Sequence, residues 1–261
     1  MRIVTLMENT ACREGLVCEH GLSLYLETCG KKILFDAGQT NAFARNAEAL
    51  GVDLSQVDFA VLSHGHYDHG GGLAEFLRIN KTAPVYLHRD AFGPHFNGTQ
   101  KYIGLDPDLQ ASDRLIFTQG ETALTAGLTL CGLENLFQPI EPYGLTRREG
   151  ENFLPEDFRH EQYLLVEEAG KKICISGCSH RGVVNIAKAF APDVLVGGFH
   201  FQKLDPAGAG RAALEQASRE LLALPTVFYT GHCTGLAQFD FLKAHMGERL
   251  HAISTGAEMI L

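Results

Sequence analysis

The 261-residue sequence has no tryptophan, and no apolar run in it approaches the roughly 18 residues that a membrane-spanning helix needs. Met1 leads directly into the strand-like run 3–6, without the basic start, long apolar stretch and cleavage site of a secretory leader. These absences predict a cytoplasmic protein with no membrane partner. The core has to rest on Phe, Leu, Ile and Val.

Paired cysteine motifs are also absent. The seven cysteines are odd in number and scattered, whereas disulfide frameworks and cysteine-rich zinc sites show paired spacings such as CxxC. The sequence therefore predicts free thiols in a reducing cytoplasm. The cysteines are Cys12, Cys18, Cys29, Cys131, Cys174, Cys178 and Cys233.

No run of lysine or arginine stands out, and the formal net charge is −9. A nucleic-acid partner is therefore not expected, because phosphate backbones are bound by basic surfaces. A small anionic substrate remains compatible, since bound metal cations would reverse the sign of the charge locally. The composition is 45% hydrophobic and 20% charged, as in ordinary globular proteins, and there is no linker-like tract. We expect one domain over residues 1–261.

The order of expected elements is strand-rich at first and then alternates between strand and helix, which indicates mixed sheets covered by helices. Cys29-Gly30-Lys31 predicts a hairpin turn between two early strands. The expected strands are 3–6, 22–27, 32–35, 57–62, 84–87, 172–176, 193–196, 226–229 and 257–261. The expected helices are 41–50, 72–79, 182–190, 207–224 and 236–245.

Histidine, in contrast, is abundant, with 12 residues, and four metal-competent side chains fall between positions 64 and 69. His64 and His66, two apart in an extended segment, can point the same way and clamp one cation. Asp68 and His69 can address a second cation beside it, and the three glycines at 70–72 let the backbone turn sharply. Imidazole and carboxylate ligands favour zinc, iron or manganese over calcium. We predict one or two divalent metal ions, with zinc foremost and magnesium also considered.

Three later segments, 176–182, 197–200 and 231–235, each place a histidine directly after an expected strand. If these strands run parallel with helical crossovers, all four histidine segments emerge at one sheet edge, where α/β ligand sites form. Taken singly, each later histidine is more typical of a capping or surface residue. Two metal sites need further ligands, however, so we predict His180 and His232 as ligands. His200 and Cys178 remain candidates, since a small buried cysteine beside a turn is also common.

Two long polar segments, 91–110 and 138–159, are expected to be loops and candidate walls of a substrate pocket. A plain surface loop explains each of them equally well on its own. His95 and His160 lie in or beside these segments. We interpret them, like His88, His245 and His251, as ordinary histidines with no metal role.

The HxHxDH pattern after a strand resembles the signature of the metallo-β-lactamase superfamily. Other segments resemble one subgroup, the dihydropterin synthases of methanopterin biosynthesis and their bacterial relatives: EHGLS at 19–23, FDAG at 35–38, SGCSH at 176–180, GFH at 198–200 and GHCTG at 231–235. The resemblance spans nearly the whole chain. It implies an α/β (α+β) protein, a four-layer αββα sandwich with a metal site at one edge of the sheets.

The resemblance also implies a role for particular side chains. Two adjacent metals would have three ligands each, His64, His66 and His180 for one, and Asp68, His69 and His232 for the other. Asp36 would be a buried carboxylate that orients the first cluster from behind. Glu19 and His20 would lie close by, although a packed hydrogen-bonded pair explains them equally. Asp68 and His180 are the expected catalytic residues.

The chain departs from the superfamily pattern at Ser176-Gly177-Cys178, where many hydrolases carry a metal-bridging Asp in a Ser-Gly-Asp turn. One hypothesis is hydrolysis of an ester, thioester, phosphodiester or lactone by a metal-activated water that Asp68 orients or deprotonates. The other is transfer, in which an aromatic amine displaces pyrophosphate from a pterin-methyl diphosphate. Transfer needs no activated water, which fits the missing Asp.

Arg147, Arg148, Arg181 and Lys203 are candidate phosphate-binding residues, although each is also explained as an ordinary surface charge. A third hypothesis comes from a different class: a non-catalytic metal-binding or redox-sensing protein. It is based on Cys178 and Cys233, each close in sequence to an expected ligand.

Overall fold

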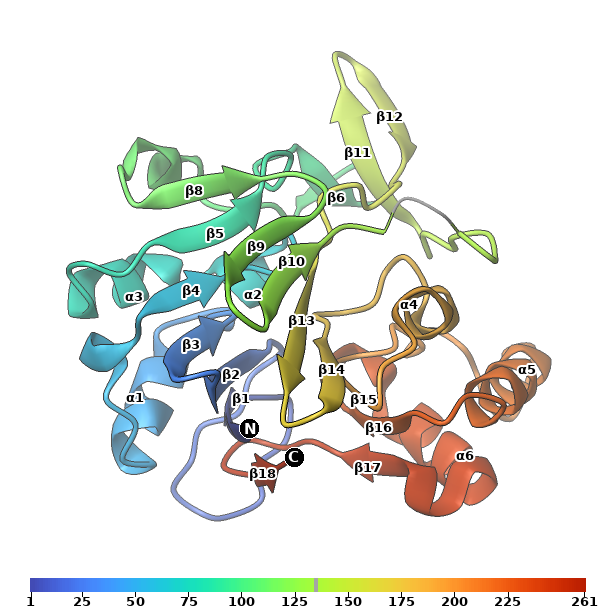
Figure 1. Cartoon of the computed structure of the whole chain (residues 1–261). Helices are drawn as coiled ribbons and strands as arrows, with labels where there is room; N and C mark the ends of the chain where they lie inside the picture. Colours follow the sequence, from blue (N-terminus) through green and yellow to red (C-terminus); the bar gives the residue numbers. More distant parts are fainter. Residues whose placement is uncertain (134–135) are drawn as a thin grey trace.

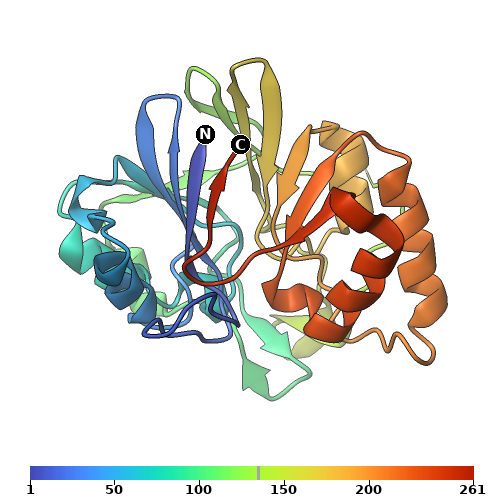
Figure 2. The same ribbon diagram turned by 90° about the horizontal axis from the view of Figure 1, so that it is seen from below.

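The computed structural model describes residues 1–133 and 136–261. Two seven-stranded sheets lie against each other, and helices cover the outer face of each, so the layers run helix, sheet, sheet, helix (Figures 1 and 2). The expected αββα sandwich is confirmed. The termini lie side by side, because β1 (Arg2–Met7) pairs with β18 (Glu258–Ile260). In the described residues, no helix is long and apolar enough to cross a membrane.

The first sheet has the strand order β18-β1-β2-β3-β4-β5-β8. The hairpin expected at residues 29–31 is present, and Cys29 and Gly30 both have positive φ, as the tightest hairpin turns require. The helices α1 (Ala42–Ala49) and α3 (Leu73–Ile79) connect the parallel strands β3, β4 and β5. The other strands of this sheet are β2 (Ser23–Thr28), β3 (Lys31–Phe35), β4 (Phe59–Val61), β5 (Val85–His88) and β8 (Leu115–Thr118).

The second sheet has the order β17-β16-β15-β14-β13-β10-β9. Its strands β14 to β17 are parallel neighbours, and they are joined by α4 (Val183–Phe190), α5 (Arg211–Leu222) and α6 (Leu236–Met246). The strands are β9 (Thr122–Thr125), β10 (Leu128–Cys131), β13 (Tyr163–Glu168), β14 (Lys171–Ile175), β15 (Val194–Val196), β16 (Val227–Thr230) and β17 (Leu250–Ala252).

Side chains that alternate in direction along the strands contact the helices on one face of a sheet and the other sheet on the opposite face. Leu34 packs with residues of α1 and α3, whereas Ile33 and Phe35 on either side of it pack between the sheets. From the second sheet, Ile173 and Ile175 face them. Successive strand side chains point to opposite faces, and both faces are buried in the last three residues of β3 and β14, which are therefore apolar.

Three expectations need correction. The segments 91–110 and 138–159 are not only loops, because they form a third sheet, β12-β11-β6-β7. Its strands are two to five residues long and carry polar side chains, so no apolar alternation reveals them: β6 (His95–Asn97), β7 (Lys101–Tyr102), β11 (Leu145–Glu149) and β12 (Asn152–Pro155).

The helix expected at 207–224 begins four residues later, since Asp205 holds residues 207–210 in a turn through its side-chain and backbone oxygens. The four histidine segments do not share one sheet edge. The segments at 176–182, 197–200 and 231–235 follow the parallel strands β14, β15 and β16, but 63–72 follows β4 of the other sheet. The site therefore forms where the two sheets meet.

Candidate metal centre

The histidine-rich segment 63–72 is packed closely against the backbone of neighbouring segments. A Cβ at Gly65 would lie 1.9 Å from the carbonyl oxygen of Ala91, and one at Gly72 would lie 2.1 Å from that of Ala37. The short helix α2 (Tyr67–Gly70) separates them and carries Asp68 and His69. Glycine is needed here for close approach of backbones, because neither residue has a positive φ.

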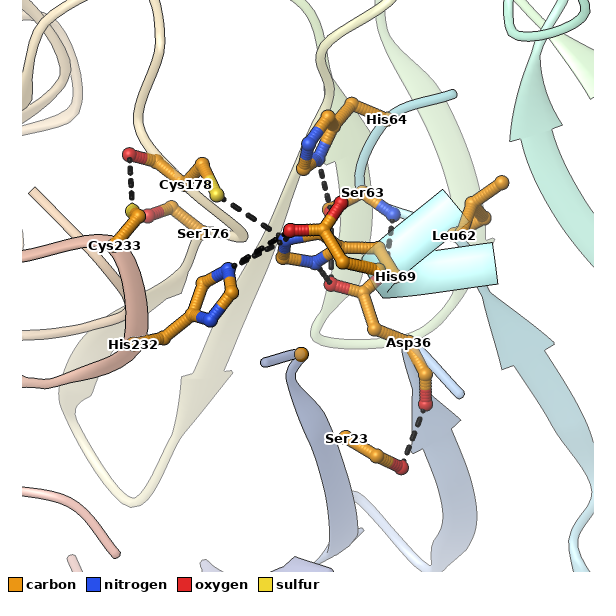
Figure 3. Close-up of polar contacts among 12 residues, drawn as sticks. Ser23, Asp36, Leu62, Ser63, His64, His69, Ser176, Cys178, His232 and Cys233 are labelled. Atoms are coloured by element: carbon orange, nitrogen blue, oxygen red, sulfur yellow. Dashed lines mark hydrogen bonds and ion pairs between the residues drawn. The ribbon is translucent and has the colours of Figure 1, made fainter. Parts of the chain in front are cut away.

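Asp36, directly after β3, fixes the orientation of two histidines (Figure 3). Its buried carboxylate accepts hydrogen bonds from the Ser63 backbone N–H, from Ser63 Oγ and from His69 Nδ1, each at 2.7 Å. Because the Ser63 hydroxyl proton is donated to Asp36, Ser63 Oγ accepts from His64 Nδ1 at 2.8 Å. Both rings are thus protonated at Nδ1, and their Nε2 atoms face the centre. The expected role of Asp36 agrees with this geometry.

The first group of ligands contains His64 and His180, whose Nε2 atoms are 3.2 Å apart. The ring of His66 lies beside both, with its centroid 4.6 Å from that of His64 and 4.9 Å from that of His180. The thiol of Cys178 joins the pair within 4.8 Å. The structure thus brings together the three residues that the resemblance assigns to one metal.

The second group contains His69 and His232, whose Nε2 atoms are 3.1 Å apart. Asp68 Oδ2 lies 3.4 Å from His232 Nε2 and 3.2 Å from His20 Nε2. His232 is oriented as His69 is, since its Nδ1 lies 3.0 Å from the Asn9 side-chain oxygen. His20, predicted to lie close by and as a possible additional metal residue, is therefore in contact with this group.

Cys178 stands between the two groups. Its Sγ is 3.1 Å from His69 Nε2, and it also lies within 4.8 Å of the ligand atoms of His64 and His180 (Figure 3). It therefore lies between the two groups of candidate ligands. Burial raises the pKa of its thiol well above the ordinary value. A bound cation would reverse that preference, because thiolate is the form that ligates.

The surroundings of the candidate ligands shift the pKa values of their side chains. Burial lowers the pKa of His64, His66 and His180 well below the ordinary value, so these rings are neutral, the form that ligates. Burial also opposes charge on His69, but the carboxylates of Asp36 and Asp68 outweigh it and raise its pKa to about 9.

The residues fit a divalent transition metal. Two pairs of imidazole nitrogens point at each other, and a carboxylate and a thiol lie beside them, which is the mixed N, O and S donor set of zinc and iron sites. The geometry therefore supports two adjacent cation sites and leaves the identity of the metal open.

Other predicted residues are placed differently. Glu19 caps the turn after Gly38, since its carboxylate accepts from the backbone of Gln39 and Thr40, and it is not a ligand. His200, with φ +56°, lies against His180 at a centroid distance of 4.2 Å, and neither of its ring nitrogens has a hydrogen-bond partner among the described residues. With Cys178 and Cys233 it forms a further group of ligand-type atoms.

Two cavities meet at His180 and His200. One, of about 250 Å³, holds the metal-facing side chains and has two lysines on its rim, Lys101 and Lys203. The other, of about 370 Å³, lies over α4 and α5. Its lining includes the apolar residues Val183, Val184, Leu204, Ala213 and Ala217 and the polar residues Gln138, Glu141, Gln216 and Glu220. Residues of the segment 138–159 line both cavities, and residues of the segment 91–110 line the metal cavity, as expected for pocket walls.

Of the four basic residues considered for phosphate, only Lys203 lines the metal cavity. Arg147 pairs with Glu149 and Asp157, Arg148 lies over the ring of Phe96, and Arg181 donates to the Asp157 carbonyl. Lys101 was missed because it sits in β7, within a segment expected to be a loop.

His95, His160 and Glu156 were missed as well. Both histidines, interpreted from the sequence as ordinary, lie buried beside His66, together with the carboxylate of Glu156. The third sheet brings them there. Histidine content near the pocket segments was the only signal in the sequence.

Comparisons with known proteins agree with the fold. The model of the metallo-beta-lactamase superfamily matches residues 16–179. A 7,8-dihydropterin-6-methyl-4-(beta-D-ribofuranosyl)-aminobenzene-5'-phosphate synthase from Methanocaldococcus jannaschii is 28% identical over 97% of this chain and 95% of its own. An uncharacterised protein of the same organism is also 28% identical, over 94% and 98%.

Among solved structures, a protein described as a metal-dependent hydrolase of the beta-lactamase superfamily has a TM-score of 0.85 at 28% identity, over 100% of this chain and 99% of that one. Zinc-bound PqqB from Methylobacterium extorquens shares the fold, with a TM-score of 0.59 at 11% identity over 100% of both chains. The family match covers more than half of the sequence and the solved relative spans all of it. The chain belongs to the metallo-β-lactamase superfamily.

Proposed function

We propose that this protein is a metal-dependent transferase that acts on a phosphorylated, ring-containing small molecule, as a dihydropterin synthase does. The observation that carries the proposal is the pair of cavities that meet at His180 and His200. One offers ligand-type side chains and two lysines, and the other offers apolar walls. A substrate that has an anionic group and a flat apolar body matches both.

The anionic end belongs in the metal cavity. Divalent cations held by the two groups would neutralise a diphosphate and the pyrophosphate that leaves. Lys101 and Lys203 are exposed at the rim, where their ammonium groups also lie close to the Tyr67 hydroxyl and the Tyr143 carbonyl. They can attract and orient the same anion. This local charge fits a small anionic substrate even though the chain as a whole is acidic.

The transfer step uses groups of the chain to hold the reactants and move one proton. The amine nitrogen forms the new bond to the methylene carbon as the carbon–oxygen bond to diphosphate breaks, and the amine then loses a proton. Burial disfavours the Asp68 carboxylate, but His69, His20 and His232 outweigh it and hold its pKa well below the ordinary value. Asp68 is thus ionised and can accept the proton, while His200 can hydrogen bond to either reactant.

Hydrolysis is the alternative, and the solved relative described as a hydrolase favours it. The position of Cys178 argues for transfer, because the carboxylate that helps to hold a bridging water in many superfamily hydrolases is replaced by a thiol. The same feature keeps the third hypothesis open to experiment. Cys178 and Cys233 both line the metal cavity, where an oxidant could reach them.

The test is pyrophosphate release from a dihydropterin-methyl diphosphate by the metal-loaded protein, with and without an aromatic amine. The proposal predicts release only with the amine, and loss of release in His66→Ala. Equal release without the amine, or steady turnover of generic phosphodiesters or thioesters, would instead establish hydrolysis. If neither occurs and metal uptake changes on thiol oxidation, the protein is a sensor. An exposed-histidine variant, His245→Ala, is the matched control and should behave as the wild type.

A further inference from the structure

Each candidate metal group takes its side chains from both large sheets. The segment 63–72 follows β4 of the first sheet and contributes to both groups, whereas His180 and His232 follow β14 and β16 of the second sheet. A cation binds tightly only where its ligands already stand at the right distance from one another. Contacts that join the two sheets beside each group should therefore control the affinity for metal.

One such contact is made by Glu161, which is buried just before β13 of the second sheet. Its Oε1 accepts from the backbone N–H of His180 at 2.7 Å. Its Oε2 accepts from the backbone N–H of Arg181 at 2.9 Å and from the Tyr163 hydroxyl at 2.5 Å. The carboxylate thus holds the main chain of the turn that carries His180.

The residues on either side of Glu161 bind the segment that carries His64 and His66. His160 Nδ1 accepts from the backbone N–H of Gly65 at 2.9 Å, and the backbone N–H of Gln162 donates to the carbonyl of Ser63 at 2.8 Å. All three residues of the stretch 160–162 are buried. This stretch therefore connects the two parts of the first metal group directly, from one sheet to the other.

Glu8 makes the corresponding contact at the second group. It follows β1 of the first sheet, and its buried Oε1 accepts from the backbone N–H of His232 at 2.5 Å. Its Oε2 accepts from the backbone N–H and the hydroxyl of Thr10, each at 2.6 Å, and its own N–H donates to Thr255 Oγ1 at 2.7 Å. His232 has a φ of +51°, a conformation that needs support from its surroundings.

We propose that Glu161 and Glu8 are positioning residues, one for each metal group, which fix His180 and His232 against the segment 63–72 by holding their backbone N–H groups. Asp36, in contrast, acts on imidazole rings. Among the described residues, neither glutamate belongs to a group of ligand-type atoms. The inference rests on the proposed metal centre, but it does not depend on which reaction takes place there.

Amide hydrogen exchange in the metal-free wild type tests the contacts themselves. The amides of His180 and His232 bond to carboxylates instead of strand or α-helix partners, and the proposal predicts that both exchange slowly. Rapid exchange of these two amides would overturn it. This measurement needs neither metal nor a variant, so it remains decisive even where a variant does not fold.

Variants test the link to the metal. Zinc is titrated into nitrogen-15-labelled protein in competition with a chelator, and the imidazole resonances report which histidines bind. Glu161→Leu should weaken zinc binding at His64 and His180 by about 10- to 100-fold and leave the group of His69 and His232 nearly unchanged. Glu8→Leu should have the reverse effect.

Glu168→Leu is the matched control. Glu168 also joins the two sheets, since it accepts from the backbone N–H of Cys29 at 2.6 Å and from the Thr28 hydroxyl at 2.8 Å, but it lies at the far end of β13. Both zinc affinities should be unchanged in this variant.

The pattern across the variants decides the outcome. Equal weakening of both groups by either variant would show a general structural role, and folded variants with unchanged affinities would also contradict the proposal. A wild-type protein that binds no zinc would remove the metal centre and this inference with it. Zinc binding without transfer of an amine would instead overturn only the proposed reaction.

Discussion

Asp36→Asn is the most informative single substitution at this centre. The asparagine has the size of the aspartate, and it tolerates the left-handed backbone at this position, where φ is +59°. It has only one oxygen, however. When that oxygen accepts from the Ser63 backbone N–H, the amide group faces Ser63 Oγ and His69 Nδ1 and donates to them. His69 must then carry its proton on Nε2, the atom that should face the cation.

The expected magnitude follows from these contacts. Loss of a group that orients a ligand costs about 10- to 100-fold in metal affinity, or about 1.4 to 2.7 kcal/mol. Weaker hydrogen bonds to the buried amide should cost about 1–3 kcal/mol of folding free energy, which a protein of ordinary stability survives. Asp36→Asn should therefore be folded but should bind the second metal weakly.

The assay is a competition titration with a chromophoric zinc chelator, read together with circular dichroism for folding. Asp58→Asn is the matched control, because Asp58 also accepts from a backbone N–H, that of Lys32, but is exposed and lies in a different part of the first sheet. Unchanged zinc affinity in a folded Asp36→Asn protein would show that Asp36 does not orient a ligand.

Three further outcomes are expected. Removal of metal with a chelator should lower the thermal midpoint by roughly 5–10 °C, since ligand at 100 times its Kd contributes about 2.7 kcal/mol, and an unchanged midpoint would argue against a bound cation. Cys178→Ser should weaken cadmium binding more than manganese binding, because thiolate prefers the softer ion, and equal effects in a metal titration would remove Cys178 from the ligand set. Gly65→Ala should destabilise the fold by about 1–3 kcal/mol or more in denaturant unfolding, because its Cβ meets the Ala91 carbonyl. Gly132→Ala, whose Cβ meets no atom of the described residues within 4 Å, should be near neutral.

The local part of the centre is readable from sequence. His64, His66, Asp68 and His69 lie within six positions after a strand, so their proximity follows from chain geometry alone. His180 and His232 follow strands of a parallel sheet, and parallel strands bring their carboxyl ends to one edge. The family resemblance supplied the layer order and the role of Asp36, which no local pattern indicates.

What escaped prediction depends on packing between distant segments. Glu156 meets His95 across 61 residues, through strands too short and too polar to show alternation. Local patterns also could not show that the first histidine segment follows a strand of a different sheet from the later three. Which strands pair in one sheet depends on which apolar faces meet in the folded protein. The turn held by Asp205 shortened α5 for a similar reason: a side-chain acceptor competes with the helix for backbone N–H groups.

Two cations are proposed to bind at this centre. The direct measurement is an anomalous-difference map, collected at the absorption edge of the metal that elemental analysis finds in protein purified without chelators. Two adjacent peaks are expected, one between His64 and His180 and one between His69 and His232. Crystals with no peak at these positions, from protein supplied with zinc, iron or manganese, would contradict it.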